Sequence, residues 1–341
     1  MFDTTIIAGF CLVLIKVVVI TMILFGLPIP LTWIERKIAG HIQVRLGPWR
    51  VGPHGILQPI ADMVKLLFKE DVIPAKADKF LFMLAPIMSM VAIFSVFAAI
   101  PFGEGWTIPI IDKEVTLYIA DLNIAVLYIL AISGLSVYGV ILGGWASNSK
   151  YALLGGLRSA AQMISYEVAL SFAVIGAVML SNSLSLVEIV RSQEGGFWNW
   201  NFFYLPVGPV WFAIFMIAGI AESNRVPFDL VEDEGTLAAG FHVEYSAMRF
   251  SLFMLAEYVT MVTISILAVL LFFGGWSAPF PMPLPPIVWF IGKVSLFIYF
   301  FMWMRFTLPR YRYDQLMNIG WKVLIPVSLA NVLITGFMRI N

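Results

Sequence analysis

Eight long apolar segments, separated by shorter polar stretches, follow one another along the chain. A helix needs roughly 20 predominantly apolar residues to cross the hydrocarbon core of a bilayer. The segments that meet this length are 5–30, 80–102, 119–143, 160–181, 204–221, 251–274, 284–304 and 320–338. The pattern therefore predicts an all-α integral membrane protein, in which about eight transmembrane helices form one polytopic domain over residues 1–341.

One further segment has a helical pattern but is too short to cross the membrane. Over residues 56–69, apolar side chains share one face of a helix and polar side chains such as Asp62 and Lys65 share the other. A helix of this length reaches only about 21 Å, so we expect it to lie in the membrane interface. It is either an amphipathic connector or a lip over an opening through which an apolar molecule enters from the lipid.

Composition supports the membrane class and excludes several kinds of chemistry. The chain is 60% hydrophobic and 12% charged, whereas soluble domains carry about 25% charged residues. The first apolar segment lacks a basic start and a cleavage site, so we expect a retained helix rather than a signal peptide. A single cysteine, Cys11, cannot form an internal disulfide or hold an iron–sulfur cluster. The three histidines have no metal-binding spacing and no nucleotide-binding motif occurs, so we predict no metal site.

Lys and Arg residues divide unequally between the two sides of the predicted membrane domain. The loops after the first, third, fifth and seventh spans hold sixteen of them: Arg36, Lys37, Arg45, Arg50, Lys65, Lys69, Lys76, Lys79, Lys150, Arg158, Arg225, Arg249, Arg305, Arg310, Arg312 and Lys322. The opposite side, termini included, holds three: Lys113, Arg191 and Arg339. Because loops rich in Lys and Arg stay in the cytoplasm, we expect the odd-numbered loops there and both termini outside.

Acidic residues gather in the loop over residues 222–250, although bases dominate its side of the membrane. The stretch 221–245 holds six carboxylates against one base, Arg225: Glu222, Asp229, Glu232, Asp233, Glu234 and Glu244. Five ionisable residues also fall inside the predicted spans: Lys16, Asp121, Glu167, Glu257 and Lys293. Charges in the membrane normally face a partner or a wet cavity. Crowded carboxylates hold and exchange protons as a coupled group, a property that suits proton movement.

Six blocks of sequence carry a resemblance to a known family. They are ERKIAGHIQVRLGPWRVGPHGILQPIADMVKLLFKED (35–71), ADLNI (120–124), SNSKYALLGGLRSAAQMISYE (147–167), AESNRVPFDL (221–230), GFHVEYSAMRF (240–250) and LPRYRYDQLMNIGWKVLIP (308–326). In this order they resemble the H-type membrane subunit of bacterial proton-pumping NADH:quinone oxidoreductase (respiratory complex I), which is called subunit 1 in mitochondria. The resemblance covers almost the whole chain. It implies the heel subunit of the membrane arm, which is not catalytic alone.

The resemblance implies that this subunit forms the membrane side of a quinone chamber and couples quinone reduction to proton translocation. The interfacial helix 56–69 would be its lip. The chamber residues it implies are Glu35, Arg36, Arg45, Asp62, Lys65, Arg225, Asp229, Glu232 and Glu234. The implied proton path consists of Glu167, Glu222, Glu244 and Glu257. Arg305, Arg310, Arg312 and Asp314 would brace the last charged loop.

The acidic loop departs from the family pattern at one position. The family usually has three alternating glutamates there, whereas this chain has Glu232, Asp233 and Glu234, followed by Gly235 and Thr236. Thr236 stands in place of the third glutamate, so we leave it out of the predicted site.

Partners and location also follow from the resemblance. It implies quinone as the substrate, no cofactor bound by this chain alone, and flavin and iron–sulfur clusters on partner subunits. The partners are peripheral-arm subunits at the quinone site, neighbouring membrane-arm subunits and membrane lipids, without nucleic acid. We expect the bacterial cytoplasmic membrane, and an organellar inner membrane second. The alternatives are the membrane subunit of a related membrane-bound hydrogenase, or an ion transporter or channel, although the repeated halves typical of transporters are not evident.

Overall fold

The chain is helical over most of its length. The computed structural model describes residues 4–103, 105–108, 113–229, 240–280 and 284–340. Within these ranges, seven helical segments are long and apolar enough to cross a membrane, and the helix Val207–Glu222 is a shorter apolar one. The predicted all-α membrane class is confirmed, and the chain is a multi-pass membrane protein.

The helices in chain order are α1 (Thr4–Gly26), α2 (Pro28–Ile42), α3 (Gln58–Phe68), α4 (Lys79–Val96), α5 (Ala125–Gly134), α6 (Ser136–Ala146), α7 (Lys150–Ser181), α8 (Leu186–Ser192), α9 (Val207–Glu222), α11 (Ala247–Phe272), α12 (Pro286–Thr307), α13 (Tyr313–Asn318) and α14 (Ile325–Ile340). A π-helical segment, Ile319–Leu324, joins α13 to α14. Two short strands, β1 (Trp106–Ile108) and β2 (Lys113–Val115), pair antiparallel between α4 and α5.

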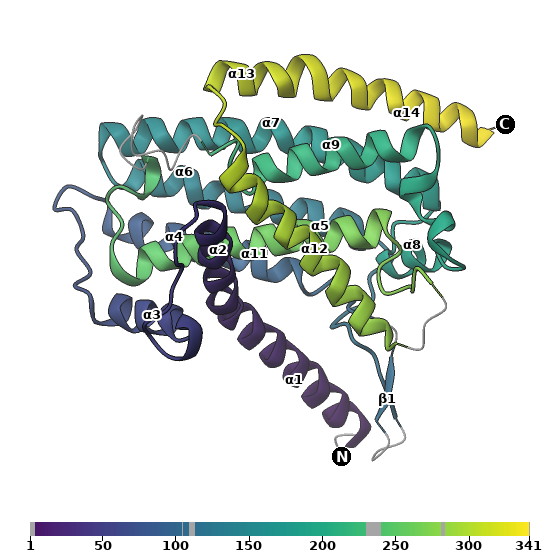
Figure 1. The fold of residues 1–341 in the computed structure, drawn as a ribbon, viewed down its shortest axis with the longest axis horizontal. Helices are drawn as coiled ribbons and strands as arrows, with labels where there is room; N and C mark the ends of the chain where they lie inside the picture. Colours follow the sequence, from purple (N-terminus) through teal and green to yellow (C-terminus); the bar gives the residue numbers. More distant parts are fainter. Residues whose placement is uncertain (1–3, 104, 109–112, 230–239, 281–283, 341) are drawn as a thin grey trace.

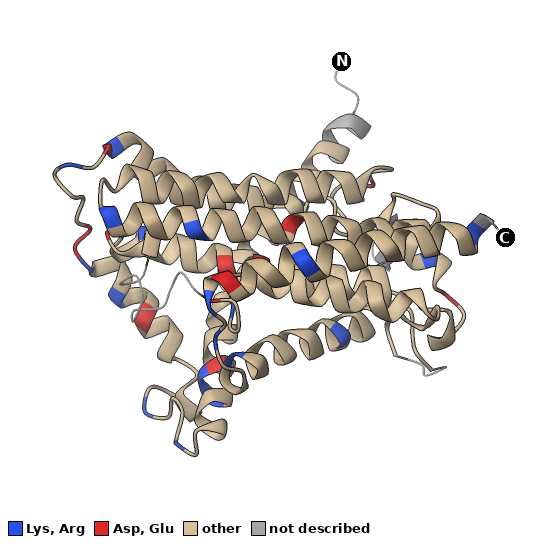
Figure 2. Cartoon of the chain, turned by 90° about the horizontal axis from the view of Figure 1, so that it is seen from above, with Lys and Arg blue, Asp and Glu red and all other residues tan. Residues whose placement is uncertain are grey.

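Helix α11 is the centre of the bundle. Of its most apolar stretch, 89% is buried inside the protein, against 6% for the first span, so the long helices pack around α11 while α1 leans away from them (Figure 1). Both termini lie toward the end that carries α8 and β1, and α3 and α13 lie toward the other end. Most Lys and Arg residues gather toward the end with α3 (Figure 2). Which end faces the cytoplasm stays a prediction.

The first predicted span continues beyond its expected end. Helix α1 stops at Gly26, and a second helix, α2, starts at Pro28 and runs to Ile42. Proline suits the first turn of a helix because its missing N–H has no partner there in any case. Glu35 and Arg36, which were expected in a loop, therefore lie on a helix.

Several other helix ends differ from the predicted ones. The predicted span 119–143 consists of two helices, α5 and α6, that meet at Leu135, and residues 119–124 before them are not helical. Asp121 therefore lies on an exposed, non-helical segment before α5, and its predicted place inside a helical span was wrong. Helix α4 ends at Val96, and α7 starts ten residues before 160, at Lys150. Hydropathy follows burial in lipid or protein, whereas helix ends depend on backbone hydrogen bonds and caps.

Among the residues that the structure describes, the two lysines inside the predicted spans are held by polar groups other than carboxylates. Lys16 Nζ on α1 donates to Thr116 Oγ1 across 2.9 Å and to the Tyr118 carbonyl across 3.0 Å. Lys293 Nζ on α12 donates to the carbonyls of Phe273, Gly275 and Ser277 across 2.7, 3.0 and 2.7 Å. Lys293 thus caps the carboxyl end of α11. The backbone carbonyls there have no hydrogen-bond partner within the helix, so they favour a positive charge.

Glycines allow α7 to approach the loop that contains the candidate site. A Cβ atom on Gly155 would lie 2.5 Å from Gly240 Cα, so only glycine permits this separation. The 3-10 turn Gly240–His242 is thereby fixed against α7, directly before α11.

Candidate functional site

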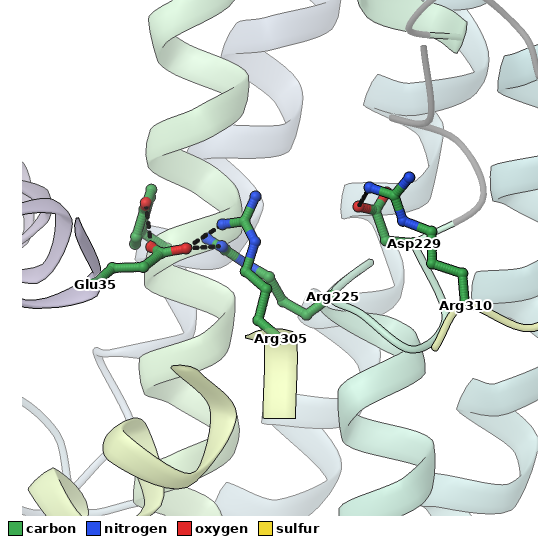
Figure 3. Close-up of polar contacts among 6 residues, drawn as sticks. Glu35, Arg225, Asp229, Arg305 and Arg310 are labelled. Carbon is green, nitrogen blue, oxygen red and sulfur yellow. Dashed lines mark hydrogen bonds and ion pairs between the residues drawn. The ribbon is translucent and has the colours of Figure 1, made fainter. Parts of the chain in front are cut away.

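The carboxylate of Glu35 is the centre of a buried charged cluster (Figure 3). Arg225 Nη1 donates to Glu35 Oε1 across 3.4 Å, and Arg305 Nη1 forms an ion pair with the same oxygen. Tyr258 donates its hydroxyl proton to Glu35 Oε2 across 2.5 Å. The side chains of Glu35 and Arg225 are each 7% exposed. Such a buried acid needs these partners, because an isolated charge in a protein interior is strongly unfavourable.

Four separate elements deliver this cluster, which we call the Glu35 cluster. Glu35 comes from α2, Tyr258 from α11 and Arg305 from the last turn of α12, while Arg225 follows the end of α9. The Arg225 guanidinium also lies 4.4 Å from the centre of the Tyr258 ring, a favourable cation–π distance. The sequence separations of Glu35 from its partners range from 190 to 270 residues.

Gln162 on α7 fixes the segment that carries Arg225. Its side-chain amide donates to the Ala221 carbonyl across 2.9 Å and to the Phe228 carbonyl across 3.0 Å. Gln162 is fully buried, so these bonds replace the water that the two carbonyls lose on folding. They hold the chain between α9 and the acidic loop in one conformation.

Asp229 forms a second ion pair beside the Glu35 cluster. Arg310 Nη2 lies 3.3 Å from Asp229 Oδ2, and Asp229 is 3% exposed. The backbone N–H of Tyr311 donates to the Pro227 carbonyl across 3.1 Å, and the Tyr311 ring stacks on Phe228. The loop after α12 is therefore attached to the segment after α9 by both polar and aromatic contacts.

Helix α3, the segment predicted to lie in the membrane interface, packs against α2 and α11 and carries its own ion pair to α2. Arg36 Nη1 lies 2.5 Å from Asp62 Oδ2, and the side chains are 50% and 34% exposed. Partial burial opposes ionisation of Asp62, but hydrogen bonds from Arg36 and Gln58 outweigh it and hold the pKa of this carboxyl below its ordinary value.

The lowered pKa of Asp62 predicts a pH-dependent contribution to stability. The ionised pair stabilises the protein above the unfolded-state pKa of about 3.9, and this contribution is lost as the pH falls through the lower folded-state pKa. Asp62→Asn should therefore lower the free energy of unfolding at pH 7 by less than about 1 kcal/mol, because the pair is half-exposed, and thermal unfolding measures this change. The difference from the parent should vanish once the pH lies below the folded-state pKa of Asp62, where both forms of the protein lack the charge. A difference that persists in strong acid would contradict this origin.

A cavity of about 280 Å³ opens between α2, α3 and α11. Most of its wall is apolar, with Phe25, Ile29 and Met254 among the lining residues. Arg36 and Asp62 lie at one part of the wall, and Tyr258 of the Glu35 cluster lies at another. The cavity therefore connects the face that carries the interfacial helix with the buried charges.

Glu222 and Glu257 lie around a second, much smaller cavity on the other side of α11. This cavity of about 30 Å³ has room for water and is also lined by Ser89 and Ser136. Glu257 Oε1 lies 3.5 Å from His242 Nε2, and His242 is almost fully buried. Glu222 Oε2 is buried and accepts no hydrogen bond from the described residues.

Glu167 lies on the face of α7 near the break between α5 and α6, and its carboxylate is close enough to Glu222 for the two groups to interact electrostatically. It is half-buried and lines an open cavity of about 320 Å³ with Ile164 and Phe172. A Cβ atom on Gly134 would lie 2.5 Å from Glu167 Oε1, so the glycine at the end of α5 makes room for this carboxylate.

Other predicted site residues do not join these clusters. Within the described part of the chain, the side chains of Arg45, Lys65 and Glu244 make no hydrogen bond or ion pair, although the charge of Lys65 acts on Asp62 from a distance. Arg312 and Asp314 pair with each other at 2.5 Å on the surface, 78% and 52% exposed. Glu232 and Glu234 lie outside the described residues.

Two residues of these clusters were missed by the sequence analysis. Tyr258 looked like one more aromatic residue of an apolar span, and His242 looked isolated because its metal spacing was absent. In the sequence, the feature that could have pointed to both residues is Glu257, a carboxylate inside the apolar span 251–274. Tyr258 is its neighbour on the helix and therefore faces another side of α11, and His242 lies in the turn just before the start of that helix.

Metal chemistry has no support among the described residues. They contain no group of three or more His, Cys, Asp or Glu side chains placed to hold a metal ion.

Comparisons with known proteins agree with this geometry. The family model described as NADH dehydrogenase matches residues 15–336. The chain is 60% identical over 324 residues to an H-type subunit of NADH-quinone oxidoreductase (number 2) of Rhizobium meliloti (strain 1021), and the match covers 95% of this chain and 96% of that protein. It is 52% identical over 319 residues to a protein of the same name from Geobacter metallireducens, with 90% and 89% covered. The chain therefore belongs to the NADH dehydrogenase family, whose members similar to it are named as H-type subunits of NADH-quinone oxidoreductase.

Proposed function

We propose that this chain forms the membrane side of the quinone chamber of NADH-quinone oxidoreductase and couples quinone reduction to proton translocation. Its membership of the family supports a membrane subunit of this complex, not catalytic alone. The observation that carries the finer proposal is the cavity between α2, α3 and α11, which extends from apolar residues to Tyr258 in the Glu35 cluster. A quinone combines a polar ring with an apolar tail, and this cavity offers both kinds of wall.

The interfacial helix would serve as the lip of this opening. Helix α3 contacts α2 and α11, and the apolar residues Pro59, Met63 and Leu66 on α3 line the cavity. A molecule that diffuses in the membrane meets this helix first. We therefore prefer the lip over a mere amphipathic connector.

The protonation of the buried carboxylates would follow the charge of the reduced quinone. Two electrons add negative charge to a poorly solvated pocket, and a unit charge 4 Å away is worth about 4 kcal/mol at an effective dielectric constant near 20. Such a change is sufficient to shift protons among nearby carboxyl groups. Glu222 and Glu257 with the small cavity between them, and Glu167 on the outer face of α7, would carry these protons onward.

The names of the relatives favour this function over the two alternatives. The similar proteins are subunits of NADH-quinone oxidoreductase rather than of a hydrogenase or a transporter. The partner subunits that copurify with the chain would test the choice directly. The quinone, flavin and iron–sulfur clusters remain expectations for the assembled complex.

Two variants in the reconstituted complex test the proposal. Ser251→Phe adds a ring inside the 280 Å³ cavity and should lower NADH:quinone turnover at least tenfold, while electron transfer to a soluble artificial acceptor stays unchanged. Glu222→Gln should lower the number of protons moved per NADH. A photoreactive quinone analogue should label α3 or α11 in the parent and not in Ser251→Phe.

The control adds the same ring elsewhere. Val17→Phe changes an exposed position on α1 outside this cavity and should leave both rates unchanged. Full quinone turnover and unchanged labelling in Ser251→Phe would refute the chamber. An unchanged proton ratio in Glu222→Gln would refute the assignment of that carboxylate.

A further inference from the structure

An exposed patch of large apolar side chains lies at the end of the bundle that carries α8 (Figure 1). It belongs to the segment between α8 and α9 and to the segment after α11. We call it the aromatic patch, and its members are Phe197, Trp198, Phe203, Tyr204, Leu205 and Phe280. Trp198 is 73% exposed, Leu205 71% and Phe280 53%. Apolar side chains that gather on a surface normally mark a place of contact with a partner or with the membrane.

Ring contacts within the aromatic patch hold its exposed side chains in place. The centre of the Phe197 ring lies 4.3 Å from that of Trp198 and 5.7 Å from that of Phe280. The centre of the Trp198 ring also lies 5.6 Å from that of Phe203. Aromatic pairs at such distances stabilise each other. Phe197 thus joins the two segments, and Trp198 stays exposed although it contacts two rings.

Two buried amide side chains attach the same segment to the end of the central helix α11. Gln193 Nε2 donates to the Leu270 carbonyl across 3.0 Å, and Asn201 Nδ2 donates to the Leu271 carbonyl across 2.8 Å. Gln193 Oε1 accepts from the backbone N–H groups of Asn201 and Gly274 across 3.2 and 3.1 Å. The aromatic patch is therefore formed in advance, so contact with another surface does not require the segment to become ordered.

The two stretches of sequence that supply the aromatic patch are free of charge. No Asp, Glu, Lys or Arg occurs between Glu194 and Glu222, or between Glu257 and Lys293. A surface in water is usually rich in charged residues, and the rim of a protein–protein interface is usually polar. A long uncharged surface with exposed rings instead favours contact with lipid.

The ends of three helices of the bundle lie beside the aromatic patch. Helix α9 starts at Val207, α11 ends at Phe272 and α12 starts at Pro286. Helices α11 and α12 are long and apolar enough to cross a membrane, so their ends are expected near its surface. Trp and Tyr concentrate at this level because each combines an apolar ring with a polar N–H or O–H group.

We propose that the aromatic patch inserts into the lipid bilayer at the level between head groups and acyl chains, and so fixes the depth of this end of the bundle. Trp198, Leu205 and Phe280 enter the lipid, whereas the exposed Glu194 next to the patch stays in water. Because the patch is attached to α11 through Gln193 and Asn201, this contact also holds the central helix at one depth. The inference does not depend on the proposed quinone chamber.

The test measures access of water to the patch in the whole purified complex, placed in phosphatidylcholine nanodiscs. Cys11→Ser removes the only cysteine of this chain, and Trp198→Cys, Leu205→Cys or Glu194→Cys then adds one at a chosen position. A water-soluble maleimide reacts with the thiolate, which lipid both shields and disfavours. The cysteines at 198 and 205 should each react about tenfold more slowly than the matched control at 194. After unfolding in detergent, all three should react alike.

A crosslinking measurement then identifies what covers the patch. Benzoylphenylalanine, a photoreactive residue, replaces Trp198 in the same complex, and mass spectrometry of this chain detects its adducts. The expected product is an adduct with phosphatidylcholine. Reaction at 198 and 205 as fast as at 194 would show that the patch faces water and would overturn the proposal. A crosslink to another subunit or to a second copy of this chain, or the absence of a lipid adduct, would overturn it as well.

Discussion

Glu35→Gln is expected to lower the free energy of unfolding by about 3–5 kcal/mol, the usual cost of breaking a buried ion pair. The variant keeps the shape of the side chain but removes the charge against which Arg225 and Arg305 pack. It should also lower quinone-linked turnover more than any other single change at the site, because Tyr258 loses its charged acceptor at the same time. Thermal unfolding of the purified complex and NADH:quinone assays measure the two effects.

Two variants show whether burial is the cause. Asp314→Asn makes the same change of acid to amide in the exposed Arg312–Asp314 pair and should leave the thermal midpoint unchanged. Tyr258→Phe removes only a hydroxyl group from the Glu35 cluster and should cost about 2 kcal/mol, the scale of a hydrogen bond to a charged group. If Glu35→Gln is as stable as Asp314→Asn, the cluster does not hold these helices together.

Lys293→Met is expected to destabilise the protein by about 3 kcal/mol, because up to three carbonyls lose their donor and each buried unsatisfied group costs about 1–3 kcal/mol. These are the carbonyls of Phe273, Gly275 and Ser277, at and beyond the end of the central helix α11. The change should appear as a lower thermal midpoint of the complex in detergent without added lipid, while Lys322→Met, which alters an exposed lysine, should not change it. A parent-like midpoint in Lys293→Met would show that other groups hold this helix end.

The number and kind of the spanning helices were accessible from sequence because membrane burial leaves a local signal. Roughly 20 consecutive apolar residues indicate a span whatever the rest of the chain does. The short amphipathic helix α3 was likewise visible, because the alternation of polar residues such as Asp62 and Lys65 with apolar residues repeats with every helical turn. Helix ends were less accessible: the break at Leu27 and the division at Leu135 depend on backbone hydrogen bonding that hydropathy does not report.

For the site residues, too, the sequence predicted one part of the result and only the structure showed the other. The resemblance placed Glu35 and Arg225 in one chamber and Arg305 in another charged loop, yet nothing in the sequence predicted that the three side chains meet. The structure brings them onto one carboxylate and adds Tyr258. Asp121 shows the reverse case, since its apolar surroundings in sequence suggested burial while its segment lies on the surface.

The sequence by itself determined that this chain is a multi-pass helical membrane protein of the NADH dehydrogenase family, because both the apolar lengths and the six motif blocks are local. Only the tertiary structure decided which charges are neighbours. Ion pairs between residues 190 to 270 positions apart depend on how α2, α11 and α12 pack, and packing is decided by shape and volume rather than by any single segment. The partners of Lys293 also depend on the tertiary structure, because backbone carbonyls are free to accept from a side chain only where a helix ends.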